Sequence, residues 1–113
     1  MSSMRNNVFL IGRLGKDPEL LTVKNGQKLA KVSLATSDFY KDDSGELVQN
    51  TQWHNCIAWG KTAELMHSFL KKGKEVAFSG KLTYQTYEDK EGVIRNQTQV
   101  VIGDFVLLGK KEE

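Results

Sequence analysis

The aromatic residues are the side chains in this sequence whose type and spacing point most clearly to chemistry. Trp53 and Trp59 lie six residues apart in the alternating run 51–59. In a strand, every second side chain shares a face, so both tryptophans point away from Cys56 and Ala58, which are small enough to fill a core. An exposed indole has one obvious use, which is to stack on another planar ring.

Two tyrosines extend this pattern. Tyr87 falls on the polar side of a second alternating run, 75–88, and Tyr40 sits in a loop rich in turn formers. Aromatics on one surface stack the bases of single-stranded nucleic acid, at roughly 1–3 kcal/mol per base. Two other interpretations stay open, because tryptophans in half-buried strands usually belong to the core and aromatics are also enriched at subunit contacts. We expect one surface lined by Tyr40, Trp53, Trp59 and Tyr87.

Charge supports a nucleic-acid partner once it is divided along the chain. The whole sequence carries only +2, but residues 1–37 carry +4 and residues 61–81 carry +3, whereas the other two stretches are acidic. Basic side chains near the aromatics would contact phosphate. Those that we expect to do so are Arg13, Lys31, Lys41, Lys61 and Lys81.

No catalytic or metal site emerges. His54 and Cys56 lie two apart on one strand face, but two ligands do not make a zinc site, and a packed or interface histidine is the simpler interpretation. The acidic residues cluster in turns, and no nucleophile–base pair has credible spacing. We therefore predict no catalytic residue, no metal and no cofactor, and keep a small metal-binding protein built on His54 and Cys56 as a remote alternative.

The elements that must position these residues are five strands and one helix. The predicted strands are 8–11, 29–38, 51–59, 75–88 and 93–108, and the predicted helix is 62–70. Three strands, a helix and two strands is the order of an all-β, five-stranded Greek-key barrel of the OB type, with its helix between the third and fourth strands. An α+β sandwich with the helix on one sheet face also fits the pattern.

Two of these elements carry finer expectations. The apolar run 8–11 predicts a strand buried on both faces. The helix is expected to begin at Thr62 as its N-cap, with Glu64 in the first turn. Its apolar face would hold Ala63, Met66, Phe69 and Leu70.

Size and composition limit the class of protein. The chain has 113 residues, 39% of them hydrophobic and 27% charged, which suits one small domain. A domain this small buries only about two thirds of its unfolded surface, so self-association is expected. It has one cysteine, no secretion signal and no long apolar segment, which indicates a cytoplasmic protein without a membrane partner.

Several spaced motifs resemble one family. The opening NVFLIGRLGKDPEL of residues 7–20 is followed by SLATS at 33–37, TQWH at 51–54, GKTAE at 60–64 and SGKL at 79–82. In this order they resemble the bacterial-type single-stranded DNA-binding proteins. The resemblance runs from Asn7 to Leu108.

The resemblance implies an OB-fold protomer that assembles as a homotetramer. It would bind and protect single-stranded DNA in replication, recombination and repair, in the cytoplasm at the nucleoid, and catalyse no reaction. The family's stacking aromatics fall on the four already selected, and a family histidine near the subunit interface falls on His54. An accessory, dimeric OB protein of the primosome type and an RNA-binding OB protein remain alternatives.

The resemblance also sets domain limits and departures. It predicts a flexible leader over 1–6, the DNA-binding domain over 7–108, and a short charged end over 109–113 without the acidic tip through which relatives recruit replication and repair proteins. Tyr40 and Tyr87 stand where the family often has tryptophan. Asn55, Thr83 and Gln85 stand where it often has a basic residue, so a shallow salt dependence is expected.

Overall fold

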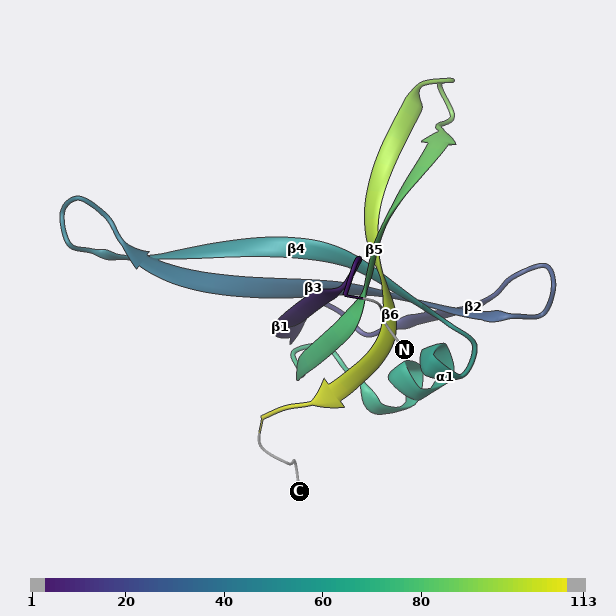
Figure 1. Ribbon diagram of the computed structural model, residues 1–113, viewed down its shortest axis with the longest axis horizontal. Coiled ribbons are helices and arrows are strands. Elements are labelled where there is room, and N and C mark those ends of the chain that lie inside the picture. The colour runs from purple at the N-terminus through teal and green to yellow at the C-terminus, as the bar shows by residue number, and fades with distance from the viewer. Residues whose placement is uncertain (1–3, 110–113) are drawn as a thin grey trace.

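Strands account for most of the protein, a computed structural model that describes residues 4–109 (Figure 1). Within these residues one helix, α1 (Gly60–Phe69), lies between β4 (Leu47–Trp59) and β5 (Glu75–Glu88). The strands are β1 (Val8–Leu14), β2 (Glu19–Thr22), β3 (Lys28–Lys41), β4 (Leu47–Trp59), β5 (Glu75–Glu88) and β6 (Ile94–Leu107).

The sheet closes on itself into a barrel. Its order is β1-β5-β6-β4-β3-β2, and β1 also pairs with β3 at Arg13↔Ala35 and Leu14↔Leu34. All pairings are antiparallel except that between β4 and β6. At Gly12 a built Cβ would overlap the carbonyl oxygen of Ala35, so only glycine lets β1 and β3 approach this closely. The predicted OB barrel is confirmed, and the sandwich alternative is not.

The barrel interior is apolar and closed at one end by the helix. On β3 the buried residues Ala30, Val32 and Leu34 alternate, and they pair with Ala58, Cys56 and His54 of β4, so this face of the hairpin lines the core. Met66 of α1 and Leu70, which directly follows the helix, belong to the same buried cluster as the strand residues. The largest fully buried side chains are Phe78, Leu34, Met66, Leu70, Val76 and Cys56.

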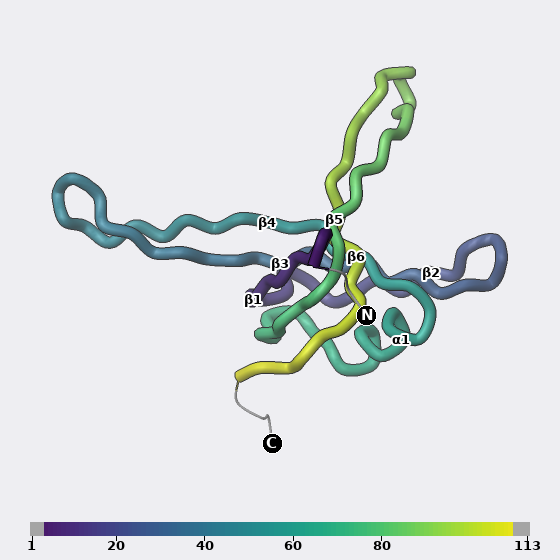
Figure 2. The backbone as a smooth tube through the Cα atoms, in the orientation of Figure 1, coloured from purple at the N-terminus to yellow at the C-terminus, as the bar shows by residue number. Residues whose placement is uncertain are grey.

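Two hairpins extend far beyond the barrel. The β3–β4 hairpin and the β5–β6 hairpin form long arms that point in different directions (Figures 1 and 2). They raise the radius of gyration to 16.1 Å, whereas a compact chain of this length would have about 13 Å. Side chains on the arms are exposed on both faces, which makes them available for binding.

Three expectations about the strands were wrong. A short strand, β2, was missed, because its four residues show no useful alternation. Strand β1 is not buried on both faces: Phe9 is 64% exposed and Ile11 51%. Tyr40 lies in strand β3 and not in a loop, because regular pairing with β4 continues to Lys41↔Leu47.

The helix also departs from expectation. It begins at Gly60, with Trp59 at the N-cap position and no side-chain cap, so Thr62 is not the cap and no acidic residue lies in the first turn. Phe69 is 56% exposed, whereas Ala63, Met66 and Leu70 are buried as predicted. The positive φ of 61° at Gly60 turns the chain directly from β4 into the helix.

The predicted end segments fall partly outside the described residues, which exclude 1–3 and 110–113. Within the predicted leader, the Asn6 carboxamide accepts from the N–H of Leu82 and donates to its carbonyl, both at 2.9 Å. No helix within residues 4–109 is long and apolar enough to cross a membrane.

Candidate nucleic-acid interface

The two tryptophans lie on the face of β4 that turns away from the core. Paired residues of neighbouring strands share a face, and the pairs Leu29↔Trp59 and Ala35↔Trp53 are on the side opposite to the buried Ala58. Trp53 is 62% exposed and Trp59 37%. We call this side of the β3–β4 hairpin the outer face.

Tyr40 does not share the outer face. It pairs with Val48 and lies in line with Leu34, whose side chain fills the core. It is exposed only because the arm has left the barrel at this point. The four predicted aromatics therefore do not line one surface, since the strand stays regular and its alternation carries Tyr40 to the opposite side.

Phe39 takes the place that Tyr40 was expected to fill. It pairs with Gln49, on the same side as Trp53, and is 62% exposed. Sequence reasoning missed it because the strand was ended at residue 38. Continuing the alternation of Ser33 and Ala35 by two more steps would have found it.

Tyr87 lies on the side of the β5–β6 arm that adjoins the outer face of the β3–β4 hairpin. It pairs with Arg95, and the alternate pairs Gln85↔Gln97 and Thr83↔Gln99 lie on the same side of the β5–β6 arm. Where the arms meet, β4 runs parallel to β6 with Ile57 beside Val101. The outer faces of both arms are thus one continuous surface.

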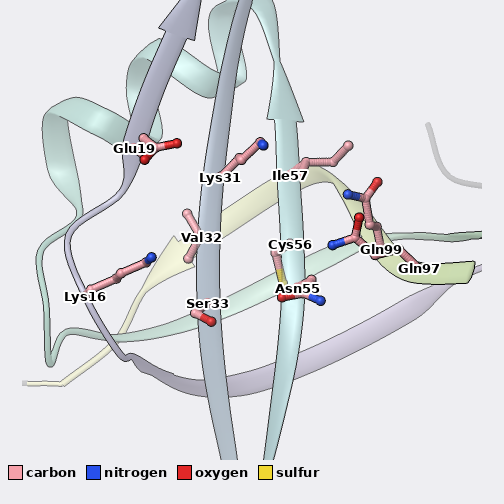
Figure 3. Close-up of a pocket in the computed structure, with 10 residues that line it drawn as sticks. All are labelled: Lys16, Glu19, Lys31, Val32, Ser33, Asn55, Cys56, Ile57, Gln97 and Gln99. Carbon is pink, nitrogen blue, oxygen red and sulfur yellow. The ribbon is translucent and has the colours of Figure 1, made fainter. Parts of the chain in front are cut away.

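A hollow of about 180 Å³ lies at this junction (Figure 3). It sits between the rows that hold Trp53 and Trp59. Its polar walls come from four separate parts of the chain, and its floor includes Ile57, which is 6% exposed. The polar lining residues are Lys16, Glu19, Lys31, Ser33, Asn55, Gln97 and Gln99.

The predicted basic residues are spread around this surface. Lys31 lines the hollow, Lys41 lies on the outer face near the arm tip, and Lys81 lies on the outer side of β5 beside Val101. Lys61 is exposed in the first turn of α1. Within residues 4–109 the side chains of these lysines make no hydrogen bond or ion pair, so their ammonium groups are available to phosphate.

Arg13 is placed differently from the lysines. Its guanidinium donates a hydrogen bond of 3.1 Å to the carbonyl of Gly73, in the loop that follows α1. Lys16, which we did not select from the sequence, lines the hollow instead. Lys16 lies in the connection between β1 and β2, which crosses the outer face, and no local sequence pattern predicts this position.

The ring of Trp53 rests on the backbone of Gly15. A Cβ built at Gly15 would overlap the indole, with its nearest atom inside normal contact distance. The glycine therefore supports one side of the ring and leaves the other open. This contact orients Trp53 for stacking before any ligand arrives.

His54 is hydrogen-bonded and Cys56 is buried, so neither side chain is placed to bind a metal ion. The Nε2 atom of His54 lies 2.9 Å from the Oγ1 atom of Thr36. Burial raises the pKa of Cys56 to about 12, so its thiol stays protonated and unreactive at neutral pH. In the part of the chain that the structure describes, no three His, Cys, Asp or Glu side chains are grouped to hold a metal ion.

A five-stranded OB barrel with aromatic and basic side chains on one open surface defines a class of proteins that hold single-stranded nucleic acid. Comparison with known proteins narrows this class. The chain belongs to the single-strand binding protein family, whose model matches residues 5–108.

Curated relatives agree with this assignment. A single-stranded DNA-binding protein 1 of Chlorobaculum tepidum is 42% identical over 95% of this chain and 67% of its own length. A single-stranded DNA-binding protein of Neisseria meningitidis is 38% identical over 96% of this chain and 62% of its own. The chain thus spans somewhat less than two thirds of the Neisseria relative.

Solved structures agree as well. The protein in a Plasmodium falciparum SSB complex with single-stranded DNA is 27% identical, with a TM-score of 0.85 and coverage of 96% of this chain and 99% of that one. A deletion mutant of the single-stranded DNA binding protein from Thermus aquaticus gives 28% identity and a TM-score of 0.79, covering 92% of this chain and 50% of that one.

Proposed function

We propose that this chain binds single-stranded DNA along the outer face, by stacking bases on Trp53 and Trp59 and holding phosphates with lysines. The observation that carries the proposal is the placement of both tryptophans on one side of β4, exposed and flanking a polar hollow. Stacking needs no particular base, so the binding does not depend on a defined sequence.

The outer face offers a track for several nucleotides. At about 3.3 Å per residue, the six residue steps from Trp53 to Trp59 span about 20 Å. Phe39 lies four residues beyond Ala35, which pairs with Trp53, and extends the track by about 13 Å. Tyr87 offers a further platform on the second arm, and we keep Tyr40 as a contact that approaches from the opposite side of the first.

We propose that the chain assembles with copies of itself into a homotetramer. An apolar row crosses the outside of three strands at Ile11↔Ala77↔Val106, with Ile11 51% and Val106 56% exposed, and Phe9 beside it. Such a row is costly to leave in water and suits a subunit contact. We also retain His54 as an interface residue. Mass measurement in solution should give four copies, whereas two copies would favour an accessory protein of the primosome type.

The setting of this activity follows from the family. We propose that residues 7–108 form the binding domain and that it protects single-stranded DNA in the cytoplasm, at the nucleoid, during replication, recombination and repair. The protein acts by binding alone, since the family is one of DNA-binding proteins. Replication and repair proteins are further candidate partners.

The test is a titration with oligo-dT at several salt concentrations. The two tryptophans are the only ones in the chain, so their emission reports binding directly. We expect strong quenching and an affinity that falls as salt rises, with a slope that counts the phosphates neutralised. An absence of quenching and of complex formation at low salt would overturn the proposal.

A further inference from the structure

Gln99 is the one buried polar side chain among residues 4–109, and its amide oxygen has no partner. The residue is 8% exposed, and its Oε1 atom accepts no hydrogen bond from the chain within residues 4–109. A buried acceptor without a donor is unfavourable for folding, so it needs a reason to be there. Its position supplies one, because Gln99 lines the hollow (Figure 3). That hollow lies between the strand positions of the two tryptophans.

The size and the walls of the hollow limit what it can hold. A volume of about 180 Å³ equals the share of about six water molecules, which is well below the size of a pocket for a drug-sized ligand. Ser33 and Asn55 bring further hydrogen-bonding groups to it. Lys16 and Lys31 add two positive charges, and Glu19, which pairs with Lys31 across β2 and β3, adds one negative charge. This combination suits the polar edge of one flat ring whose phosphate lies at the rim.

We propose that this hollow is a base-edge subsite, in which the amide oxygen of Gln99 accepts a hydrogen bond from the exocyclic amino group of a nucleobase. The inference rests on the proposed function, because a strand stacked on Trp53 and Trp59 must pass over the hollow that separates them. Cytosine, adenine and guanine carry such an amino group, and thymine and uracil do not. The subsite therefore gives a modest base preference to a surface that otherwise binds without regard to sequence.

The geometry allows the contact without moving the backbone. Gln99 is held in β6 opposite Thr83, whose hydroxyl donates to the backbone carbonyl of Gln99 at 3.4 Å. Rotation about the last side-chain bond of a glutamine is broad, so the amide can turn its oxygen toward a ring in the hollow.

The experiment compares oligo-dC with oligo-dU of equal length, which differ at position 4 of the ring, an amino group against a carbonyl, and at N3, an acceptor in cytosine and an N–H donor in uracil. Tryptophan quenching gives both dissociation constants at several salt concentrations. We expect the wild-type protein to bind oligo-dC roughly fivefold more tightly, equivalent to about 1 kcal/mol. Salt should weaken both complexes while leaving their ratio unchanged, because a neutral hydrogen bond releases no counterions.

Gln99→Met tests the residue, since methionine keeps the length of the side chain and removes the acceptor. This variant should bring the ratio to about one while its affinity for oligo-dU stays near the wild-type value. Gln85→Met is the matched control, because Gln85 lies on the same side of the β5–β6 arm, is exposed and does not line the hollow. It should keep the wild-type ratio.

Each outcome decides the proposal. A wild-type ratio of one, or a fivefold ratio that survives in Gln99→Met, would overturn the base-edge subsite. The wild-type comparison stands even if Gln99→Met fails to fold. If neither oligonucleotide binds the wild-type protein, the proposed function itself fails, which is a different result from binding without preference.

Discussion

The two arms of this protein share a backbone design and differ in what they display. Each ends in a five-residue turn in which an aspartate accepts hydrogen bonds from two backbone N–H groups, at Asp42 and at Asp89, followed by a glycine with φ near +80°. The outer face of the β3–β4 arm carries Trp53 and Phe39. The outer face of the β5–β6 arm is mainly polar, with one aromatic at Tyr87.

This difference shows that the shape of an arm and its binding surface are set by different residues. The turns fix the length and register of both arms, and the face assignment decides what each arm can bind. We infer that the β3–β4 arm supplies most of the stacking energy and the β5–β6 arm supplies hydrogen-bonding groups.

Removing one aromatic from each arm tests the division directly. Trp53→Ala should weaken binding of oligo-dT by roughly 1–3 kcal/mol, because one stacked base is lost. Tyr87→Ala should cost less, because a single ring stands there among polar neighbours. Thermal unfolding is the control, and a large loss of stability in Trp53→Ala would place the ring in the core instead.

The contact between Gly15 and the ring of Trp53 can be changed without replacing a residue that we propose to bind DNA. Gly15→Ala places a methyl group where the indole now rests, and it should weaken binding by about 1 kcal/mol, at the lower end of one stacking contact. Gly103→Ala is the matched control, since its Cβ would meet only the Ser79 carbonyl oxygen at 3.9 Å. Equal affinities for the two variants would mean that the orientation of Trp53 does not matter.

Phe39 and Tyr40 make a matched pair on opposite faces of one strand. Phe39→Ala should weaken binding of oligo-dT by about 1 kcal/mol, and Tyr40→Ala by less, because only Phe39 lies on the side of Trp53. Fluorescence titration of both variants measures the difference. The opposite order would show that DNA follows the other face of the arm.

Sequence alone predicted the barrel because the evidence for it is local. Alternation located the core of β3, β4 and β5, and the bounds of β5 at residues 75 and 88 were correct. What failed depends on contacts between distant segments. The polarity of residues 38–41 does not tell whether β3 continues, because the arm is exposed on both faces. Neither Gly15 under Trp53 nor Gln99 beside Asn55 leaves a local pattern, since each contact joins strands far apart in the chain.

The acid sensitivity of the two turns gives the smallest expected effect. The N–H of Glu46 is the main cause that lowers the pKa of Asp42, and the Arg95 guanidinium, 2.9 Å away, is the main cause for Asp89. Each folded carboxylate therefore ionises below the ordinary value of 3.8, so its stabilisation is present above that pH and is lost as the pH falls through the folded pKa.

Replacing both aspartates should flatten this dependence. The double variant Asp42→Asn, Asp89→Asn should lose less stability than the wild type between about pH 7 and about pH 3, measured by urea unfolding. Asp43→Asn is the control, because the Asp43 carboxylate makes no hydrogen bond in the described structure. If the double variant loses as much stability as the wild type between these pH values, the two aspartates do not cause the acid sensitivity.

We propose that DNA lies on the outer face across both tryptophans, and variants that keep a single tryptophan can show whether it does. Trp59→Phe leaves only Trp53 to emit, and Trp53→Phe leaves only Trp59. We predict that saturating oligo-dT quenches the emission of each variant, because each remaining indole stacks on a base. If either indole keeps its full emission while the complex forms, the strand does not follow the outer face between them.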